Sequence, residues 1–364
     1  MRPTTEKLLQ SSIDVILAGQ SPSGAYVASP NFPSYRFAWL RDGAFCAMAM
    51  DAAGQRDSAR RFHDWVAAVI ERHADAVVDI IARLTAGDQV DQLRMMPTRY
   101  TLDGILESEQ DEVWPNFQLD GYGTWLFALE AHYSGAVPEA LLTAVATVAD
   151  YLVSAWEVAC FDYWEEFGDR RHTSTLASLA AGLEAAGRIL PGRGYDACSA
   201  LVAETVMSWA TTPAGFTKGP TDARVDASLL SLSTPFGLVA PDDPRMVATV
   251  RRIETDLRSP SGGIRRYQGD TFYGGNPWLM LTAWYGWHQA MAGDREAAEY
   301  ARDWVEARAD AEGMLAEQVL DEPQSPAFVE IWTEKWGPVA DPLLWSHAQY
   351  ILLINELSTL KGHP

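Results

Sequence analysis

Two stretches of the sequence carry carboxylates in settings that suit acid and base chemistry. The first is 161–168, Phe-Asp-Tyr-Trp-Glu-Glu-Phe-Gly, in which Glu165 and Glu166 are adjacent and flanked by aromatic residues. Two ionised carboxylates buried together repel each other, so we expect one of them to have a raised pKa, which a general acid needs. The alternative is a solvated glutamate pair at the end of a helix.

The second stretch is 313–319, Gly-Met-Leu-Ala-Glu-Gln-Val, which places Glu317 in an apolar run. A single Glu in such a run is more often capped or ion-paired. As a catalytic group it would supply the second carboxylate that hydrolysis with inversion requires, about 6.5 to 9.5 Å from the first, with room for a water molecule between them. Its neighbour Gln318 could help to position that water.

Residues suited to sugar binding occur in the stretch 35–43, which runs from Tyr35 through Trp39 to Arg41, Asp42 and Gly43. A planar guanidinium donor next to a carboxylate acceptor matches vicinal sugar hydroxyls, which are both donors and acceptors. The same pair could instead be a surface ion pair that compensates a helix dipole.

Two further stretches combine aromatic and polar residues. In 114–123, Trp114 could stack on the flat face of a sugar or wedge a loop against the core. The glycine-rich stretch 262–278 contains Arg266 and Trp278, and Arg266 could contact the sugar or bridge neighbouring loops.

The elements that must position these residues are helices, because apolar residues recur at three- and four-residue spacing and strand alternation is scarce. About twelve helices are expected, at 4–19, 41–53, 56–72, 118–134, 138–157, 173–189, 195–210, 226–232, 244–257, 277–291, 294–308 and 342–359. The sequence therefore predicts an all-α fold made of helical hairpins.

The arrangement of these hairpins follows from what separates them. No low-complexity linker and no repeat of fixed period divides the chain, which favours one closed ring over residues 1–364 rather than an open solenoid. The aromatic and charged stretches precede the second, fourth, sixth, tenth and twelfth predicted helices. In a ring of hairpins every second helix is an inner one, so these stretches would meet at one shared cavity.

Composition excludes several function classes. The net charge is −21, with 49 acidic and 28 basic residues, so nucleic acid and anionic membranes are poor partners. No segment approaches the roughly 20 apolar residues of a membrane span. P-loop, dinucleotide, zinc-protease, CxxC and GxSxG motifs are absent from the sequence. Three widely spaced cysteines suggest neither a disulfide framework nor a zinc site.

Location and partners follow from the same features. The apolar residues of 1–20 are interrupted by polar ones, so we expect no cleavable signal and a cytoplasmic protein. The expected partner is a small oligosaccharide, and no oligomeric state is favoured.

Taken in order, four strings resemble glycoside hydrolase family 15, the glucoamylase family, which includes α-glucosidases of short isomalto-oligosaccharides and some trehalases. The strings are Trp39-Leu40-Arg41-Asp42, Tyr163-Trp164-Glu165-Glu166, Arg266-Tyr267 with the run 270–278, and Ala316-Glu317-Gln318. The resemblance spans nearly the whole chain. It implies an (α/α)6 barrel of six helical hairpins with its active site at the N-terminal ends of the inner helices. It also implies exo-attack on a terminal glucose with inversion, without metal or organic cofactor.

The resemblance assigns roles by position. It implies that Glu165 is the general acid and Glu317 the general base, and that Tyr35 and Gln318 hold the attacking water. The remaining matched positions would bind sugar: Arg41 and Asp42 on the terminal glucose, Arg266, Trp114 and Glu166 around the first two subsites, and Trp39, Trp164 and Trp278 as flat aromatic surfaces.

The sequence leaves several substrates and functions as alternatives. We expect neither a starch-binding domain nor an N-terminal β-sandwich, which favours short substrates, with isomaltose or another α-1,6-linked glucoside first. A trehalase would keep the glutamate pair within a tighter cavity. A sugar epimerase would use paired histidines, and a non-catalytic sugar sensor would keep only the pocket.

Overall fold

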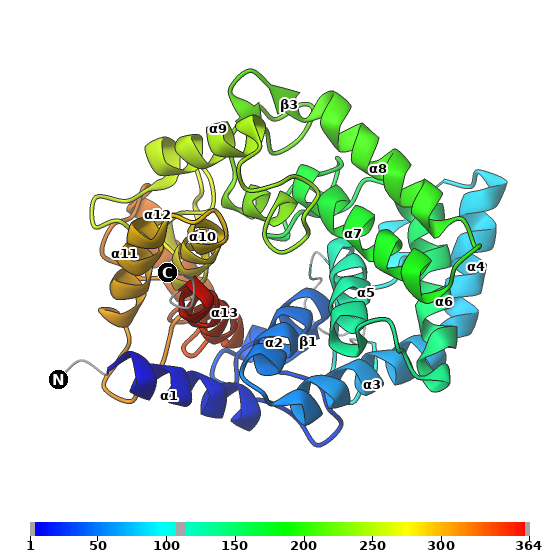
Figure 1. Ribbon diagram of the computed structural model, residues 1–364, viewed down its shortest axis with the longest axis horizontal. Helices are drawn as coiled ribbons and strands as arrows, with labels where there is room; N and C mark the ends of the chain where they lie inside the picture. The colour runs from blue at the N-terminus through cyan, green and yellow to red at the C-terminus, as the bar shows by residue number, and fades with distance from the viewer. Residues whose placement is uncertain (1–3, 90, 107–113, 115, 361–364) are drawn as a thin grey trace.

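The chain folds into an (α/α)6 barrel, a ring of inner helices surrounded by outer ones (Figure 1). The computed structural model describes residues 4–89, 91–106, 114 and 116–360. The inner elements are α2 (Leu40–Ala52), α5 (Asp120–Tyr133), α7 (Thr173–Ile189), the 3₁₀ helix η3 (Ala227–Leu232), α10 (Leu279–Met291) and α13 (Leu344–Leu360). Each packs on the next, and α13 closes the ring against α2.

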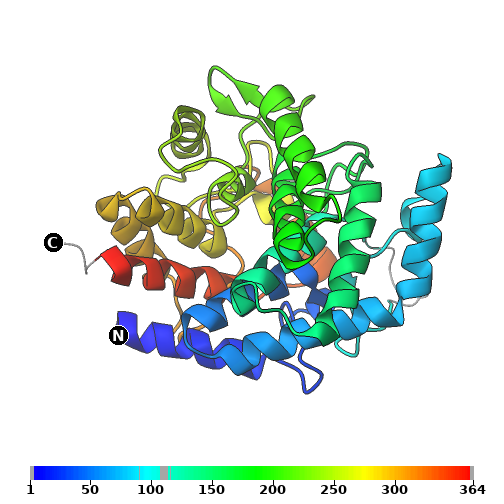
Figure 2. The ribbon, with the colours of Figure 1, turned by 45° about the vertical axis from the view of Figure 1, so that its right-hand side comes forward.

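The outer helices cover this ring and alternate with the inner ones along the chain (Figure 2). They are α1 (Thr5–Ala18), α3 (Arg56–Arg72), α6 (Glu139–Ala155), α8 (Tyr195–Trp209), α9 (Pro244–Arg252) and α11 (Arg295–Glu306). Burial distinguishes the two sets: in α11 only Ala298, Ala301, Trp304 and Val305 are buried, whereas in α10 every residue but Met291 is. A one-sided apolar stripe places a helix outside, and burial on all sides places it within.

The inner helices pack at close range where small residues allow it. A Cβ atom on Gly123 of α5 would lie 2.4 Å from the carbonyl oxygen of Ser178 in α7, and one on Gly182 would lie 2.4 Å from the carbonyl oxygen of Gly123. Glycine at both positions lets the two backbones touch. This contact fixes the spacing between α5 and α7, and with it the loops that precede them.

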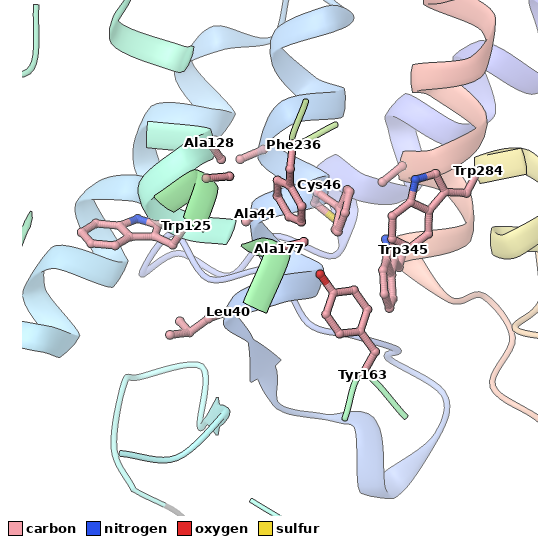
Figure 3. Close-up of a cluster of buried hydrophobic side chains, with 14 of the residues drawn as sticks. Leu40, Ala44, Cys46, Trp125, Ala128, Tyr163, Ala177, Phe236, Trp284 and Trp345 are labelled. Carbon is pink, nitrogen blue, oxygen red and sulfur yellow. The ribbon is translucent and has the colours of Figure 1, made fainter. Parts of the chain in front are cut away.

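Aromatic rings fill the centre of the barrel (Figure 3). The ring of Phe45 lies 5.3 Å from those of both Trp284 and Trp345, and Tyr163 stacks on Trp284 at 6.4 Å. Such pairs stabilise a core beyond their apolar area. Tyr163 and Trp345 also line the cavity described below, so this cluster forms its floor.

The predicted helices are confirmed in all twelve segments, with three differences in type and number. The segment 226–232 is a 3₁₀ helix, and 244–257 ends in a π-helical turn, η4 (Ile253–Leu257). Two helices were not predicted, α4 (Ala74–Ala86) and α12 (Ala327–Trp336). Helix α12 has no buried residue, and its partly buried Trp332 and Trp336 pack on the small cluster of Phe32, Tyr273 and Ala340, so its core-facing period is weaker than that of the other helices.

Strands and short 3₁₀ turns complete the described structure. Two antiparallel pairs join β1 (Ala38–Trp39) to β2 (Arg99–Tyr100) and β3 (Thr211–Thr212) to β4 (Gly215–Phe216), and the turns are η1 (Pro33–Tyr35), η2 (Gln92–Arg94) and η5 (Phe272–Gly274). Among the residues described, no helix has both the length and the apolar character needed to cross a lipid bilayer.

Candidate active site

A cavity of about 290 Å³ opens where α2, α10 and α13 begin. Its lining includes every predicted site residue except Gln318, namely Tyr35, Trp39, Arg41, Asp42, Trp114, Trp164, Glu165, Glu166, Arg266, Trp278 and Glu317. The structure adds residues that were not predicted: Ala28, Tyr163, Phe272, Trp332, Lys335, Trp336, Leu343 and Trp345. Segments far apart in the sequence thus meet at the N-terminal ends of inner helices.

Glu165 lies in a tight loop between α6 and α7. Its backbone is in the left-handed region, at φ +63°, which is costly for a residue with a side chain. Asp162 holds this loop by accepting hydrogen bonds from the backbone N–H groups of Trp164 and Glu166, each at 2.9 Å. The indole of Trp39 donates to the Glu165 carboxylate at 2.5 Å. The carboxyl group is therefore held in place from both its backbone and its side chain.

Buried ions anchor the same loop from below. The ammonium group of Lys218 lies 2.7 Å from Asp162 and also pairs with Asp226, while Trp164 donates its indole N–H to Asp226 at 3.0 Å. All of these groups are buried. The imidazole of His172 lies 3.1 Å from the carbonyl oxygen of Phe167 in this loop. Nothing in the sequence near Lys218 or Asp226 pointed to this role.

The electrostatic setting of Glu165 is that of a carboxyl group that keeps its proton. Burial raises its pKa to about 7, with Asp42 adding to the rise, while Arg41, Arg99 and the indole of Trp39 oppose it. Arg99, another residue that was not predicted, lies behind Trp39 and Trp114, with its guanidinium carbon 5.0 and 4.2 Å from their ring centres.

Glu317 enters the cavity from an extended segment that precedes α12. Its backbone N–H donates to the carbonyl of Ala340 at 2.9 Å, and its carbonyl accepts from Leu279 at 3.2 Å. The Oε1 atom accepts from the hydroxyl of Tyr35 at 3.1 Å, whereas Oε2 is buried without a hydrogen-bond partner among the described residues. Burial raises its pKa to about 8, against the opposing effects of Tyr35, Arg266 and Gln318.

The hydroxyl of Tyr35 links the two carboxyl groups electrostatically. Burial raises its pKa well above the ordinary value, and the charges of Glu317 and Glu165 raise it further. This hydroxyl therefore stays protonated and remains a donor. Gln318 lies next to Glu317 and is buried outside the lining of the cavity, and its side chain is among the groups that oppose the rise in the pKa of Glu317.

Arg41 and Asp42 form a buried pair, so the interpretation as a surface ion pair is wrong. The guanidinium lies 3.3 Å from Asp42 and 3.1 Å from Asp120, and it also donates to Gln118 at 3.1 Å. Burial raises the pKa of Asp42 to about 6, although Arg41 opposes the change. The arginine is positioned by Asp120 and Gln118, which leaves Asp42 facing the cavity.

Arg266 and Glu166 form a second charged group on the opposite wall. Arg266 pairs with Asp270, Nε to Oδ2 at 2.7 Å, and its Nη2 lies 3.5 Å from Glu166. The hydroxyl of Tyr267 donates to Glu166 at 2.5 Å. Arg266 thus bridges neighbouring loops and also lines the cavity, and its contact with a sugar stays a prediction.

The outer rim of the cavity comes from α12. Trp336 packs edge-on against Trp114 at 5.7 Å, and Trp332 packs against Phe272 at 5.1 Å. The ammonium of Lys335 lies 4.7 Å from the centre of the Trp336 ring. An aromatic wall with a cation at its edge suits a polar ring compound such as a sugar.

The barrel and this cavity define an acid–base enzyme of carbohydrates: the buried carboxyl group of Glu317, the half-buried one of Glu165, charged pairs and aromatic walls face one space. The family model described as "Glycosyl hydrolases family 15" matches residues 3–355. The chain belongs to this family and is a glycoside hydrolase. This confirms the family resemblance.

Three relatives are informative. The chain is 38% identical to the isomaltose glucohydrolase of Kribbella flavida, over 97% of this chain and 93% of that protein. A glycosidase variant solved in complex with glucose superposes with a TM-score of 0.92 at 36% identity, covering 97% of both chains. Trehalase 2 of Sulfolobus acidocaldarius is 23% identical over 77% of this chain and 53% of its own length.

Proposed function

We propose that this protein is an exo-acting, inverting α-glucosidase that releases β-D-glucose from short α-1,6-linked substrates such as isomaltose. The observation that carries the proposal is the pair of carboxyl groups on the lining of one cavity, the buried Glu317 and the half-buried Glu165. The similarity to an isomaltose glucohydrolase over nearly the whole of both chains supports the substrate class. We propose that residues 1–364 form one catalytic domain.

We assign the general acid to Glu165. An acid must keep its proton near neutral pH and release it to the glycosidic oxygen, and a pKa raised to about 7 by burial suits both steps. Arg41 and the indole of Trp39 stabilise the carboxylate that is left behind. Their opposition to burial keeps the pKa of Glu165 within working range.

We assign the general base to Glu317, because its surroundings fit a water molecule. Oε1 is held by Tyr35, while Oε2 is buried without a hydrogen-bond partner among the described residues, on a carboxyl group that belongs to the cavity lining. The order of the two pKa values alone, about 7 for Glu165 and about 8 for Glu317, would place the proton on Glu317. A water that donates to Oε2 lowers the pKa of Glu317, since a hydrogen bond to the charged form favours it.

We assign recognition of the terminal glucose to Arg41 and Asp42 at the floor of the cavity. Asp42 accepts from hydroxyls and Arg41 donates to them, and both are buried where a chain end, but not the middle of a chain, would reach. Exo-attack is supported by the similarity to an isomaltose glucohydrolase over nearly the whole of both chains.

The first experiment is proton NMR of the purified enzyme with isomaltose, maltose and trehalose in parallel, following the anomer of glucose that appears first. We expect β-glucose from isomaltose, with slower turnover of the other two. Initial α-glucose would overturn the inverting mechanism.

The second candidate function is that of a trehalase, which the similarity to trehalase 2 supports. Turnover of trehalose alone would establish it. An epimerase with paired histidines is not supported, because the residues that line the cavity in the described structure include no histidine.

A further inference from the structure

Three side chains with metal-binding atoms meet far from the cavity. Asp51, His63 and His132 each place one ligand atom within 4.8 Å of the others. They come from α2, α3 and α5, and Asp51 and His132 lie in the last turns of their helices. Since the cavity lies at the other, N-terminal ends of α2 and its inner neighbours, this cluster is separate from the catalytic site.

His63 is the unexplained member of the cluster. It is fully buried, and neither of its ring nitrogens has a hydrogen-bond partner among the residues that the structure describes. An unsatisfied buried polar group costs free energy and calls for a ligand.

The other two members of the cluster contact each other directly. Nδ1 of His132 lies 2.9 Å from both carboxylate oxygens of Asp51. The rings of His132 and His63 lie 5.1 Å apart, inclined at 48°. A small rotation of these side chains would bring two imidazole nitrogens and one carboxylate oxygen to about 2.0 to 2.2 Å from one ion.

We propose that Asp51, His63 and His132 bind a divalent transition-metal ion of the zinc class. Two imidazoles and one carboxylate match the ligands that zinc prefers, with a fourth position open to water beside the partly exposed Asp51. The negative ends of the α2 and α5 dipoles favour a cation there. The ion joins two inner helices to the outer helix α3 and thereby stabilises the barrel.

One cation already lies close to this site. The guanidinium of Arg56 is 3.7 Å from Asp51, and it donates to the carbonyl oxygen of His132 at 2.6 Å. Its charge opposes a bound metal ion. The side chain is 61% exposed, so it can turn into solvent when the metal binds.

The test uses the whole chain without a histidine tag, stripped of metal with a chelator and titrated with zinc chloride by calorimetry. We expect one equivalent to bind, and the Tm to rise by about 3 °C at a hundredfold excess over Kd. Cobalt(II) should give the visible absorption of a tetrahedral site. The absence of saturable binding would overturn the proposal.

Variants show whether zinc binds at this cluster or at other histidines of the chain. His63→Phe should weaken zinc binding by at least about 100-fold. If it does not fold, Asp51→Asn, which keeps the side-chain volume, tests the same site. The matched control is His73→Gln, because His73 follows α3 outside the cluster. Unchanged zinc affinity in the folded cluster variants would also overturn the proposal.

The charge of Arg56 allows a variant that should raise the affinity for zinc instead of lowering it. Arg56→Gln should tighten zinc binding several-fold, because it removes the cation beside Asp51. Zinc affinity that is no tighter than in the unchanged chain would locate the ion elsewhere.

Discussion

The two ends of the cavity are built on different principles. Around Glu165 the loop is fixed by a buried lysine between two buried aspartates, Lys218 between Asp162 and Asp226. At the rim, α12 has no buried residue and contributes half-buried tryptophans and the exposed Lys335. The comparison teaches that the groups proposed for chemistry and for binding the terminal glucose are held by the barrel itself, whereas the aromatic groups of the rim are carried by α12, a helix inserted between α11 and α13.

Burying the ions around Lys218 beneath the Glu165 loop costs free energy of desolvation. Removing charges from water costs several kcal/mol per ion, and their mutual attraction roughly repays it. These ions fix the position of the Glu165 loop, because Asp162 accepts hydrogen bonds from two backbone N–H groups of the loop while Lys218 balances its charge. Backbone strain at Glu165 persists because this network determines the loop.

The largest expected effect is a loss of activity at the inner end of the cavity, the end around Glu165. Glu165→Gln should lower kcat on isomaltose by about a thousandfold, because the variant cannot protonate the leaving group, and glucose binding should remain. With α-glucosyl fluoride, whose leaving group needs little protonation, most of the activity should return. Steady-state kinetics on both substrates make the measurement.

The matched control for this change is Glu166→Gln, one residue along the same loop, which should raise KM more than it lowers kcat. Recovery on the fluoride by Glu317→Ala instead of Glu165→Gln would exchange the two roles.

The second largest effect is expected on removing Lys218, the buried cation that holds the Glu165 loop. Lys218→Met should lower the free energy of unfolding by about 3 to 5 kcal/mol, because two carboxylates are left buried without their cation. Since the loop of Glu165 loosens, kcat should fall by about 10- to 100-fold even where the variant is folded.

Lys335→Met at the rim is the matched variant, and its free energy of unfolding should change by less than about 1 kcal/mol. Denaturant unfolding and kinetics measure both. Equal losses of stability in the two variants would remove the distinction between the ends of the cavity.

A smaller effect is expected from the rim aromatics. Trp336→Ala should lower kcat/KM on isomaltose by about 2- to 10-fold, the range of one aromatic contact, mainly through KM. Trp345→Ala at the floor should instead destabilise the fold by about 3 to 5 kcal/mol, because that ring is packed between Phe45 and Trp284. Unchanged kcat/KM on isomaltose and on longer substrates in the Trp336 variant would exclude α12 from substrate binding.

The sequence predicts the inner end of the cavity better than the rim, and the reason is physical. The inner helices are framed by stretches in which aromatic and charged residues are dense, and their positions follow from helical period. Helix α12 has no buried residue and packs its partly buried Trp332 and Trp336 on a small separate cluster, so its apolar period is a weaker signal. Lys218 and Asp226 are dispersed in the chain, and only the fold brings them beneath Glu165. For α4, apolar Val77, Ile80 and Leu84 with the left-handed Gly87 cap were a signal that could have been used.

The finest distinction concerns how the inner end sets the pKa of Glu165. Asp42 raises this pKa and Arg41 lowers it, and Asp42 also offsets part of the charge of Arg41. Asp42→Asn should therefore lower the pKa of Glu165. An acid must be protonated to work, so the alkaline limb of kcat/KM, near pH 7 in the unchanged enzyme, should move to lower pH in the variant.

The direction of this shift depends on the charge state of Asp42. Its own pKa is raised to about 6, so it is ionised across the alkaline limb, and the substitution removes a real charge there. Below about pH 6 Asp42 becomes protonated in the unchanged enzyme, and the electrostatic difference between the two proteins should fade. A change at rim residue Lys335 should leave the limb in place, because Lys335 is not among the main charges that set the pKa of Glu165. A limb that stays fixed in Asp42→Asn, while KM rises, would show that Asp42 binds sugar without tuning the acid.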